Sequence, residues 1–467
     1  MFKKKIINVF DEIGSGWSTK DQWIKNINGN DNRCIEILRK HIRPNMSILD
    51  VGCGSGKLLA NLIKIENNLE LIGLEPANGM RRNDCSNMEI IGTDLENYDA
   101  IKKFDIIILK QVLHHIEDKE KALIKLKSML KPEGIIFIMI PSQNYQSNII
   151  EYSENDLLGR INYKEMHAHV KNTGLSIKEH RLYKAETSFD SIYDYFKFMV
   201  AIGGVQKIYN YDKDDYKSVE KFVELYKSLF ENTSPISIDC SYAYYICGVK
   251  TDTQDEYNQE LEIAFDKWSS TYEKDVIDKI EARGYSYEAL GQKIGEYLSH
   301  DDKIPNVLEL GVGTGVLGER IYNSLEGKMV SNGIDISPGM LSQAAHKGIY
   351  ESLVCFSADE YAYSDKYDSI YSAFMFHSVK HKKKLLQKIK SILKEDGVLV
   401  IVDLVPQDSV VYEQLAHSRK YEYGAPSDYL TYSQLLDLFE DSGYTPAATE
   451  QLGIDKDYNH FMFVLRK

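Results

Sequence analysis

The sequence lacks the features that mark several special classes of protein. Its 467 residues include six cysteines, none in a CxxC pair, so neither a zinc ribbon nor a disulfide scaffold is indicated. Its longest relevant apolar run, 135–140, falls far short of the roughly 20 residues that cross a bilayer. The basic start of the chain is soon followed by Asp11 and Glu12, unlike a signal peptide. We therefore expect a cytoplasmic protein that does not enter a membrane.

An excess of positive charge is also missing. The net charge is −14, and it divides unevenly: residues 1–250 hold 34 Lys and Arg against 34 Asp and Glu, whereas residues 251–467 hold 22 against 36. An acidic second half repels phosphate backbones, which makes nucleic acid a poor candidate partner. With 43% hydrophobic and 27% charged residues the composition is that of an ordinary globular protein. At about 150 residues per domain, the length predicts two or three domains.

A repeat at an offset of about 260 residues organises the chain. The segment 47–56, SILDVGCGSG, matches 306–315, NVLELGVGTG, and further matches follow in the same order downstream. Each copy then has an amphipathic helix, which we expect to end at Gly134 or Gly397, and a continuous apolar strand of the kind buried on both faces of a parallel sheet. Strands that alternate with helices, twice over, predict two doubly wound, Rossmann-like α/β domains.

The predicted domains span residues 1–250 and 257–467, with a polar linker between them. The copies differ in two insertions: a helical one at about 187–232 in the first domain, and a tyrosine-rich one at about 405–430 in the second. Open α/β sheets bind ligands at the carboxyl ends of their strands, so each insertion is expected to form a lid there. The alternative is that these segments only cover apolar sheet edges.

A glycine-rich turn follows the first strand of each copy. A dinucleotide-binding turn reads GxGxxG, but here the third glycine comes one residue early, giving GxGxG. An acidic residue, Asp50 or Glu309, stands two residues before each turn. Both halves thereby resemble class I S-adenosylmethionine methyltransferases, and the resemblance covers nearly the whole chain. It implies two seven-stranded methyltransferase domains in tandem, each with its own S-adenosylmethionine site.

The chemistry of this cofactor explains the residue types. S-adenosylmethionine has an amino acid end, a sulfonium, a ribose and an adenine, and glycines let the backbone approach it without a Cβ in the way. Glu75 and Asp335, at the ends of the second strands, are carboxylates that can accept hydrogen bonds from both ribose hydroxyls. Asp94 and Asp359 match the family position that receives the adenine amino group, the alternative being an Asp that caps the next helix.

The second copy also has an entry segment, 265–273, similar to the one that closes over the cofactor in many small-molecule methyltransferases, and 10–17 is a looser counterpart in the first copy. The cofactor-binding residues implied by the resemblance are Asp50, Gly52, Gly54, Gly56, Glu75 and Asp94 in the first copy, and Trp268, Tyr272, Glu309, Gly311, Gly313, Gly315, Asp335 and Asp359 in the second.

Histidines follow the fourth strand of each copy. The segment 113–118, LHHIED, resembles an element of methyltransferases that act on small metabolites, and the Asn/Asp-Pro-Pro-Tyr/Phe element of nucleobase enzymes is absent. Transfer from a sulfonium needs positioning, exclusion of water and, for some acceptors, a base. We predict that His114, His115 and His377 supply it, the alternative being that they only orient the loop. With two histidines, the first domain is expected to be better equipped for an acceptor that loses a proton.

These patterns predict S-adenosylmethionine-dependent O- or N-methylation of a small-molecule or carrier-bound biosynthetic intermediate, at one site or at two successive sites. One alternative is that one domain is catalytic and the other only binds S-adenosylmethionine or its demethylated product. Another, aminopropyl transfer, has no specific signature in the sequence. No metal is predicted, because His167 and His169 lack further ligands at metal-site spacing and are typical of a plain surface helix. Nothing in the pattern predicts an oligomeric state.

Overall fold

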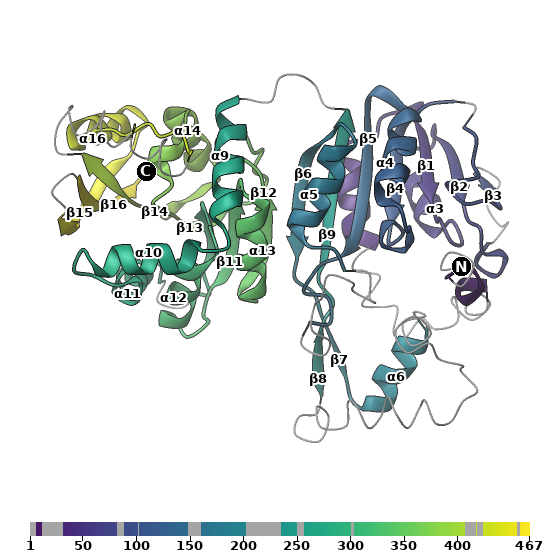
Figure 1. The fold of residues 1–467 in the computed structure, drawn as a ribbon, viewed down its shortest axis with the longest axis horizontal. Helices are drawn as coiled ribbons and strands as arrows, with labels where there is room; N and C mark the ends of the chain where they lie inside the picture. Colours follow the sequence, from purple (N-terminus) through teal and green to yellow (C-terminus); the bar gives the residue numbers. More distant parts are fainter. Residues whose placement is uncertain are drawn as a thin grey trace. The chain divides into compact units, whose positions relative to one another are not determined.

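The computed structural model describes residues 6–11, 31–81, 88–100, 102–147, 160–201, 235–249, 256–299, 303–406, 417, 424–454 and 458–467. The chain divides into two compact units. The first comprises Met1–His180 and Lys184–Thr251, and the second comprises Arg181–Tyr183 and Asp252–Lys467. Each unit is a sheet with helices packed on its faces (Figure 1).

The first unit contains a seven-stranded sheet in the order β6-β9-β5-β4-β1-β2-β3. Its strands are β1 (Ser47–Val51), β2 (Glu70–Leu74), β3 (Glu89–Ile91), β4 (Phe104–Lys110), β5 (Leu130–Pro141), β6 (Leu175–Tyr183) and β9 (Tyr242–Val249). Neighbours from β3 through β5 pair in parallel, and β9 pairs with β5 in the antiparallel sense. The helices and short elements are α3 (Lys57–Ile63), η1 (Asn78–Met80), η2 (Leu113–His115), α4 (Lys119–Ser128), α5 (Tyr163–Asn172) and α6 (Ile192–Ala201), and β7 (Glu186–Phe189) pairs with β8 (Ile236–Asp239).

The second unit repeats this plan, in the order β15-β16-β14-β13-β10-β11-β12. Its strands are β10 (Asn306–Leu310), β11 (Val330–Asp335), β12 (Tyr350–Cys355), β13 (Tyr367–Ala373), β14 (Leu393–Pro406), β15 (Thr445–Ile454) and β16 (Tyr458–Arg466). Its helices are α9 (Glu256–Trp268), α10 (Tyr272–Glu281), α11 (Tyr287–Leu298), α12 (Val316–Ser324), α13 (Pro338–His346), η3 (Phe376–Ser378), α14 (Lys382–Ile392) and α16 (Tyr432–Asp441). Two doubly wound, seven-stranded domains are therefore confirmed. Residues 202–234 and most of 407–423, the greater part of the two expected lids, lie outside the described residues.

The repeat extends to the contacts that hold the central strands. The N–H of Ser47, at the start of β1, donates to the carboxylate of Asp105 on β4 over 2.8 Å. In the second unit the N–H of Asn306, at the start of β10, donates to Asp368 on β13 over 2.9 Å. Each carboxylate accepts a backbone N–H at the start of a strand that would otherwise be unpaired. The same contact therefore holds the start of the central strand in both units.

The amphipathic helices do not end at the glycines that we expected to stop them. Helix α4 ends at Ser128, β5 begins at Leu130, and Gly134 lies inside this strand. A Cβ on Gly134 would lie 2.9 Å from the Leu130 side chain and 3.0 Å from the Asp105 carbonyl, and Gly397 is crowded in the same way. These glycines are therefore required by the close approach of a neighbouring strand, not by a helix C-cap.

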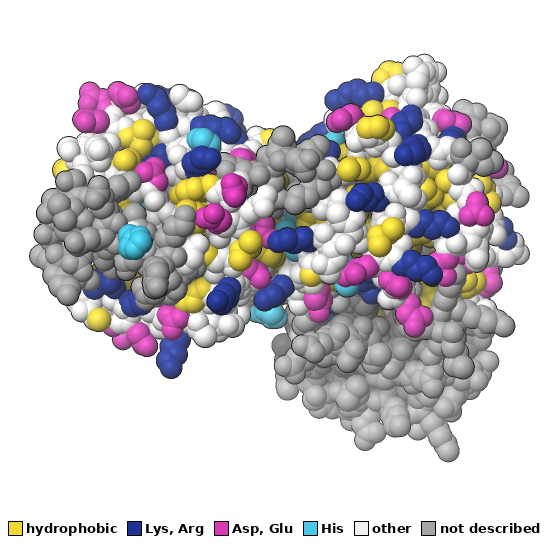
Figure 2. Space-filling view, turned by 45° about the horizontal axis from the view of Figure 1, so that its top comes forward, with side chains coloured by type: hydrophobic (Ala, Val, Ile, Leu, Met, Phe, Trp, Pro, Cys, Tyr) yellow, Lys and Arg dark blue, Asp and Glu magenta, His cyan; other side chains and the backbone are white. Residues whose placement is uncertain are grey.

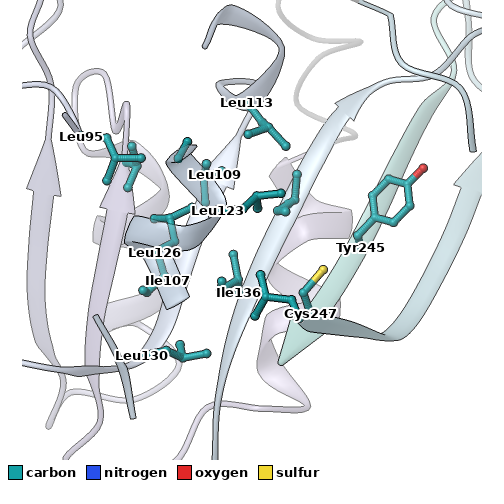
Figure 3. Packing of buried hydrophobic residues seen from close by; sticks show 14 of the residues in the cluster. Leu95, Ile107, Leu109, Leu113, Leu123, Leu126, Leu130, Ile136, Tyr245 and Cys247 are labelled. Atoms are coloured by element: carbon teal, nitrogen blue, oxygen red, sulfur yellow. The ribbon is translucent and has the colours of Figure 1, made fainter. Parts of the chain in front are cut away.

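The core of the first unit lies between the sheet and its helices (Figure 3). Leu123 and Leu126 of α4 point toward Ile107, Leu109 and other apolar residues of the strands, and all are buried. None of the described helices has both the length and the apolarity to cross a membrane. On the face drawn in Figure 2, acidic and basic side chains of the described residues are interspersed.

Helix α5 is only partly the surface helix that we expected. The ring of His169 lies 3.4 Å from a Glu120 oxygen and is partly exposed. Nε2 of His167 is buried, and the ring faces His180 and Tyr245 at centroid distances of 6.1 and 6.4 Å. Burial lowers the pKa of His167 to about 3. No group of three metal-ligating side chains is found among the described residues.

The buried Nε2 of His167 predicts a loss of stability in acid. The pKa of His167 is about 3 in the folded chain but near 6.5 when unfolded, so between these values the unfolded state binds the extra proton. The associated stability is present above pH 6.5 and falls as the pH drops toward 3, by on the order of 2–3 kcal/mol at pH 4. Urea unfolding of wild type and His167→Leu at pH 7 and pH 4 checks this. The variant should lose less stability between the two pH values, and an equal loss would contradict the expectation.

Candidate functional site

The two glycine-rich turns have the same left-handed backbone. The φ angles are 68°, 56° and 75° at Gly52, Gly54 and Gly56, and 75°, 56° and 79° at Gly311, Gly313 and Gly315. Such angles strain any residue with a Cβ. The first glycine donates its N–H to the end of the neighbouring strand, at Leu74 or Ile334, and the third precedes the first residue of α3 or α12. The turn thus lies at the carboxyl ends of the central strands, where a ligand is expected.

The loop that follows the fourth strand packs directly on this turn. A Cβ on Gly52 would lie 2.4 Å from the Val112 side chain, and a Cβ on Gly311 would lie 2.5 Å from Met375. The absence of a side chain at the first glycine is therefore what lets the histidine-bearing loop approach the turn in both units.

A carboxylate at the end of the second strand ties the turn together. Glu75 accepts the N–H of Gly54 over 2.9 Å and that of Ala77 over 2.8 Å. Asp335 accepts the N–H groups of Gly313 and Ser337 in the same arrangement, both over 2.8 Å. Each oxygen that receives one N–H retains a second lone pair. Burial raises the pKa of Glu75, and it raises the pKa of Asp335 to about 6.

The acids that precede the turns are buried in different surroundings. Asp50 is 2% exposed, and its Oδ1 has no hydrogen-bond partner among the described residues. Burial raises the pKa of Asp50 to about 7, although the charge of Lys110 opposes the shift. Glu309 accepts a hydrogen bond from the Tyr350 hydroxyl over 2.6 Å, and burial raises its pKa to about 8. Asp50 therefore keeps an acceptor atom to offer a ligand, whereas Glu309 is engaged by the protein.

The two candidate adenine acids also differ. Asp94 accepts the backbone N–H and the side-chain amide of Asn97, over 2.9 and 3.0 Å, so in this structure it stabilises the turn that follows, which is not a helix. Asp359 is 2% exposed and accepts the Ser357 hydroxyl through Oδ1. Its Oδ2 has no partner among the described residues. A buried oxygen of this kind is suited to receive an amino group of a ligand.

The entry segments make the same contact in both units. Asp266, near the end of α9, accepts the N–H of Gly339 over 2.7 Å, and Asp11 accepts the N–H of Gly79 over 2.9 Å. Sequence reasoning matched these segments but missed the two aspartates. Their signal was present, because both acids follow a phenylalanine and both glycines precede a methionine.

The aromatic residues of the second entry segment have separate tasks. Tyr272 lies against the glycine turn, since a Cβ on Gly313 would be 3.4 Å from its ring. The indole N–H of Trp268 donates to Asp275 over 2.6 Å, and its ring packs edge-on against Tyr272 with centroids 4.7 Å apart. Tyr272 is thus placed to contact a ligand in the turn, and Trp268 supports it.

The histidines follow a kink shared by the two copies. Gln111 and Phe374, directly after β4 and β13, have φ angles of 60° and 56°, unusual for residues other than glycine. The kink leads into the short helices η2 and η3. In η2 the rings of His114 and His115 lie 3.7 Å apart and are partly buried.

His377 has a carboxylate partner that sequence reasoning missed. Its Nδ1 lies 2.5 Å from Oδ1 of Asp403, a residue on β14, and both side chains are almost fully buried. The corresponding position on β5 is Ile140. That the first unit is better equipped for proton removal stays a prediction, while in the second unit the histidine of this loop is paired with a carboxylate. The acid was visible in the sequence, as the odd polar residue within an apolar strand.

The fold and this geometry agree with the comparison to known families. A family model described as a methyltransferase domain matches residues 30–183 and again 281–449, together more than half of the chain. The chain belongs to this methyltransferase family, and it carries two class I methyltransferase domains in tandem.

The individual relatives have low sequence identity to this chain. A malonyl-acyl-carrier-protein O-methyltransferase from Ilyobacter polytropus is 28% identical over 185 residues, 38% of this chain and 69% of the relative. A ubiquinone biosynthesis O-methyltransferase from Rickettsia bellii is 22% identical over 199 residues, 38% of this chain and 83% of the relative. Among solved structures, a Haemonchus contortus phosphoethanolamine N-methyltransferase 2 in complex with S-adenosyl-L-methionine aligns with a TM-score of 0.56 at 11% identity, over 94% of this chain and 98% of its own. This likeness concerns the fold.

The paired aspartates of the entry segments predict a local effect of substitution. Asp266→Ala removes the acceptor of the Gly339 N–H, so opening of the second entry segment should become about tenfold more frequent, as expected for the loss of one charge-assisted hydrogen bond. Hydrogen exchange measured by mass spectrometry on peptides from 256–271 checks this. Asp11→Ala is the matched control, because it should affect only the first unit. Faster exchange in both units after either change would contradict the assignment.

Proposed function

We propose that the chain is an S-adenosylmethionine-dependent methyltransferase with one cofactor site in each unit. The observation that carries the proposal is the carboxylate bound to the middle glycine of each turn, Glu75 on Gly54 and Asp335 on Gly313. When bound, the cofactor supplies a methyl group on a sulfonium. The remaining lone pairs of each carboxylate are suited to the two ribose hydroxyls.

Further residues fit the other parts of this cofactor. The unpartnered oxygen of Asp359 suits the adenine amino group, and Asp50 offers a buried negative charge for a ligand that carries positive charge. Tyr272, which packs on the second glycine turn, is the residue that we propose to close this site and exclude water. Asp94 would have to exchange its contacts with Asn97 for a ligand, so its role rests on the family resemblance alone.

For the acceptor we propose a small molecule or a carrier-bound intermediate, methylated on oxygen or nitrogen. The names of the relatives support this class, since one is a malonyl-acyl-carrier-protein O-methyltransferase, one is an O-methyltransferase of ubiquinone biosynthesis and one is an N-methyltransferase. His114, His115 and His377 are the proposed bases. We also propose a cytoplasmic location, which agrees with the five described cysteines being free thiols.

A second candidate is that one unit is catalytic and the other only binds the cofactor. The observation that favours it is a difference between the two units. His377 is paired with Asp403 on β14, whereas the corresponding residue of β5 is Ile140. Equal cofactor binding with methyl transfer by a single unit would support this arrangement.

Both turns are intact, so the chain should bind two equivalents of S-adenosylhomocysteine, as measured by calorimetry. Glu75→Ala should weaken the first site and Asp335→Ala the second, each by about tenfold to a hundredfold, because a charged acceptor of two hydroxyls is lost. A saturated stoichiometry of one, or equal weakening of both sites by either substitution, would count against two independent sites.

Cofactor binding should also depend on pH. In the free protein burial raises the pKa of Asp50 to about 7. A cationic ligand favours the ionised carboxylate, so S-adenosylmethionine binding releases protons, and the affinity of the first site rises about tenfold from pH 6 to pH 8 before levelling. Calorimetry of the Asp335→Ala protein in buffers of different ionisation enthalpy measures both quantities. Asp50→Asn cannot ionise and should reduce the pH dependence; an unchanged slope would argue against the link.

A further inference from the structure

The side chain of Asp403 is surrounded by hydrogen-bond donors. Oδ2 accepts the backbone N–H of His377 over 2.6 Å, and Oδ1 accepts the N–H of Leu404 over 2.8 Å. The imidazole Nδ1 of His377 lies 2.5 Å from the same Oδ1. The side chains of the pair are 3% and 1% exposed, so no bulk water competes for these bonds.

This arrangement determines the tautomer of the imidazole. An ionised carboxylate only accepts hydrogen bonds, so Nδ1 of His377 has to carry the hydrogen that it shares with Asp403. In the neutral ring the lone pair is then on Nε2. A histidine without such a partner can interchange its two tautomers, whereas this one is held in the form whose Nε2 is basic.

The orientation of the ring is fixed as well. Tyr429 stacks on it with an interplanar angle of 3° and a centroid distance of 4.9 Å. The carbonyl of His377 accepts the N–H of Asp428, whose carboxylate is paired with Lys382 over 2.8 Å. The stacking and the Asp403 bond together leave the imidazole little rotational freedom.

The pair is also next to the proposed cofactor turn. His377 lies in η3, two residues after Met375, the residue against which Gly311 packs. The same loop in the first unit packs through Val112 on Gly52. The N–H of its kink residue, Gln111, donates to Met139, as the N–H of Phe374 donates to Val402 in the second unit. The two loops therefore correspond closely, and the exchange of Asp403 for Ile140 is a difference within a shared frame.

We infer that Asp403 is a positioning residue that makes His377 the general base of the second unit, whose acceptor is therefore a hydroxyl or an amine. This inference rests on the proposed methyltransferase function. The acceptor oxygen or nitrogen forms a bond to the methyl carbon while the carbon–sulfur bond breaks and its electron pair stays on sulfur. The acceptor proton passes to Nε2 of His377, and the resulting imidazolium is stabilised by the charge of Asp403.

The tautomer is tested by nitrogen NMR on the full chain with labelled histidine, with His377→Gln identifying the signal. Wild type should show His377 with hydrogen on Nδ1. Asp403→Asn keeps the size but presents an amide N–H to the ring, and should move the hydrogen to Nε2. Asp428→Asn is the matched control and should leave the tautomer unchanged. Hydrogen on Nε2 in the wild type would overturn the inference, as would the same tautomer in wild type and Asp403→Asn.

The acceptor class is tested in a Glu75→Ala background, with methyl-labelled S-adenosylmethionine and a panel of small phenols, amines and carboxylic acids. Asp403→Asn should lower kcat about 10²-fold or more for phenols and amines, and by less than about twofold for carboxylic acids, with KM for the cofactor unchanged. Equal losses for all acceptors would reduce Asp403 to a structural role. If the proposed methyltransferase function is wrong instead, the second unit will not bind labelled cofactor, although the tautomer of His377 will be the expected one.

Discussion

The hydrogen bond from the middle glycine of each turn to the carboxylate at the end of the neighbouring strand is the contact on which the rest of each site depends. In both units the glycine that donates this bond has a left-handed φ, which would strain any residue with a Cβ. With the turn fixed in this way, its first glycine packs against the histidine loop, and its third is the N-cap of a helix. One backbone conformation therefore orients three elements that come from distant parts of the chain.

The parts that the sequence predicted are those determined by local pattern. The glycine turns, the strand-end acids Glu75 and Asp335 and the alternation of strands and helices depend on spacing within some 25 residues, and the structure brings them together as expected. Gly134 was misinterpreted because its role depends on Asp105, a residue on another strand. A glycine after a helix has the same local signature whether it caps the helix or admits a neighbouring strand.

Long-range pairing explains the other misses. Asp403 lies 26 residues from His377, and only the parallel pairing of β13 with β14 brings the two side chains together. His167 was assigned to the surface because helical periodicity does not show which neighbours a face will meet, and in the fold it turns toward Tyr245. In each case the residue type could be seen in the sequence, but its contact partner could not be predicted, because the topology of the fold determines that partner.

The entry-segment contacts have a consequence for how the chain folds. Asp11 and Gly79 are 68 residues apart, and Asp266 and Gly339 are 73 apart, so neither pair can meet until the strands between them have assembled. Contacts of such separation carry a loop-closure cost that only an already ordered framework repays. We therefore expect the entry segment of each unit, although it precedes the strands of its sheet in the sequence, to be among the last to acquire its native contacts.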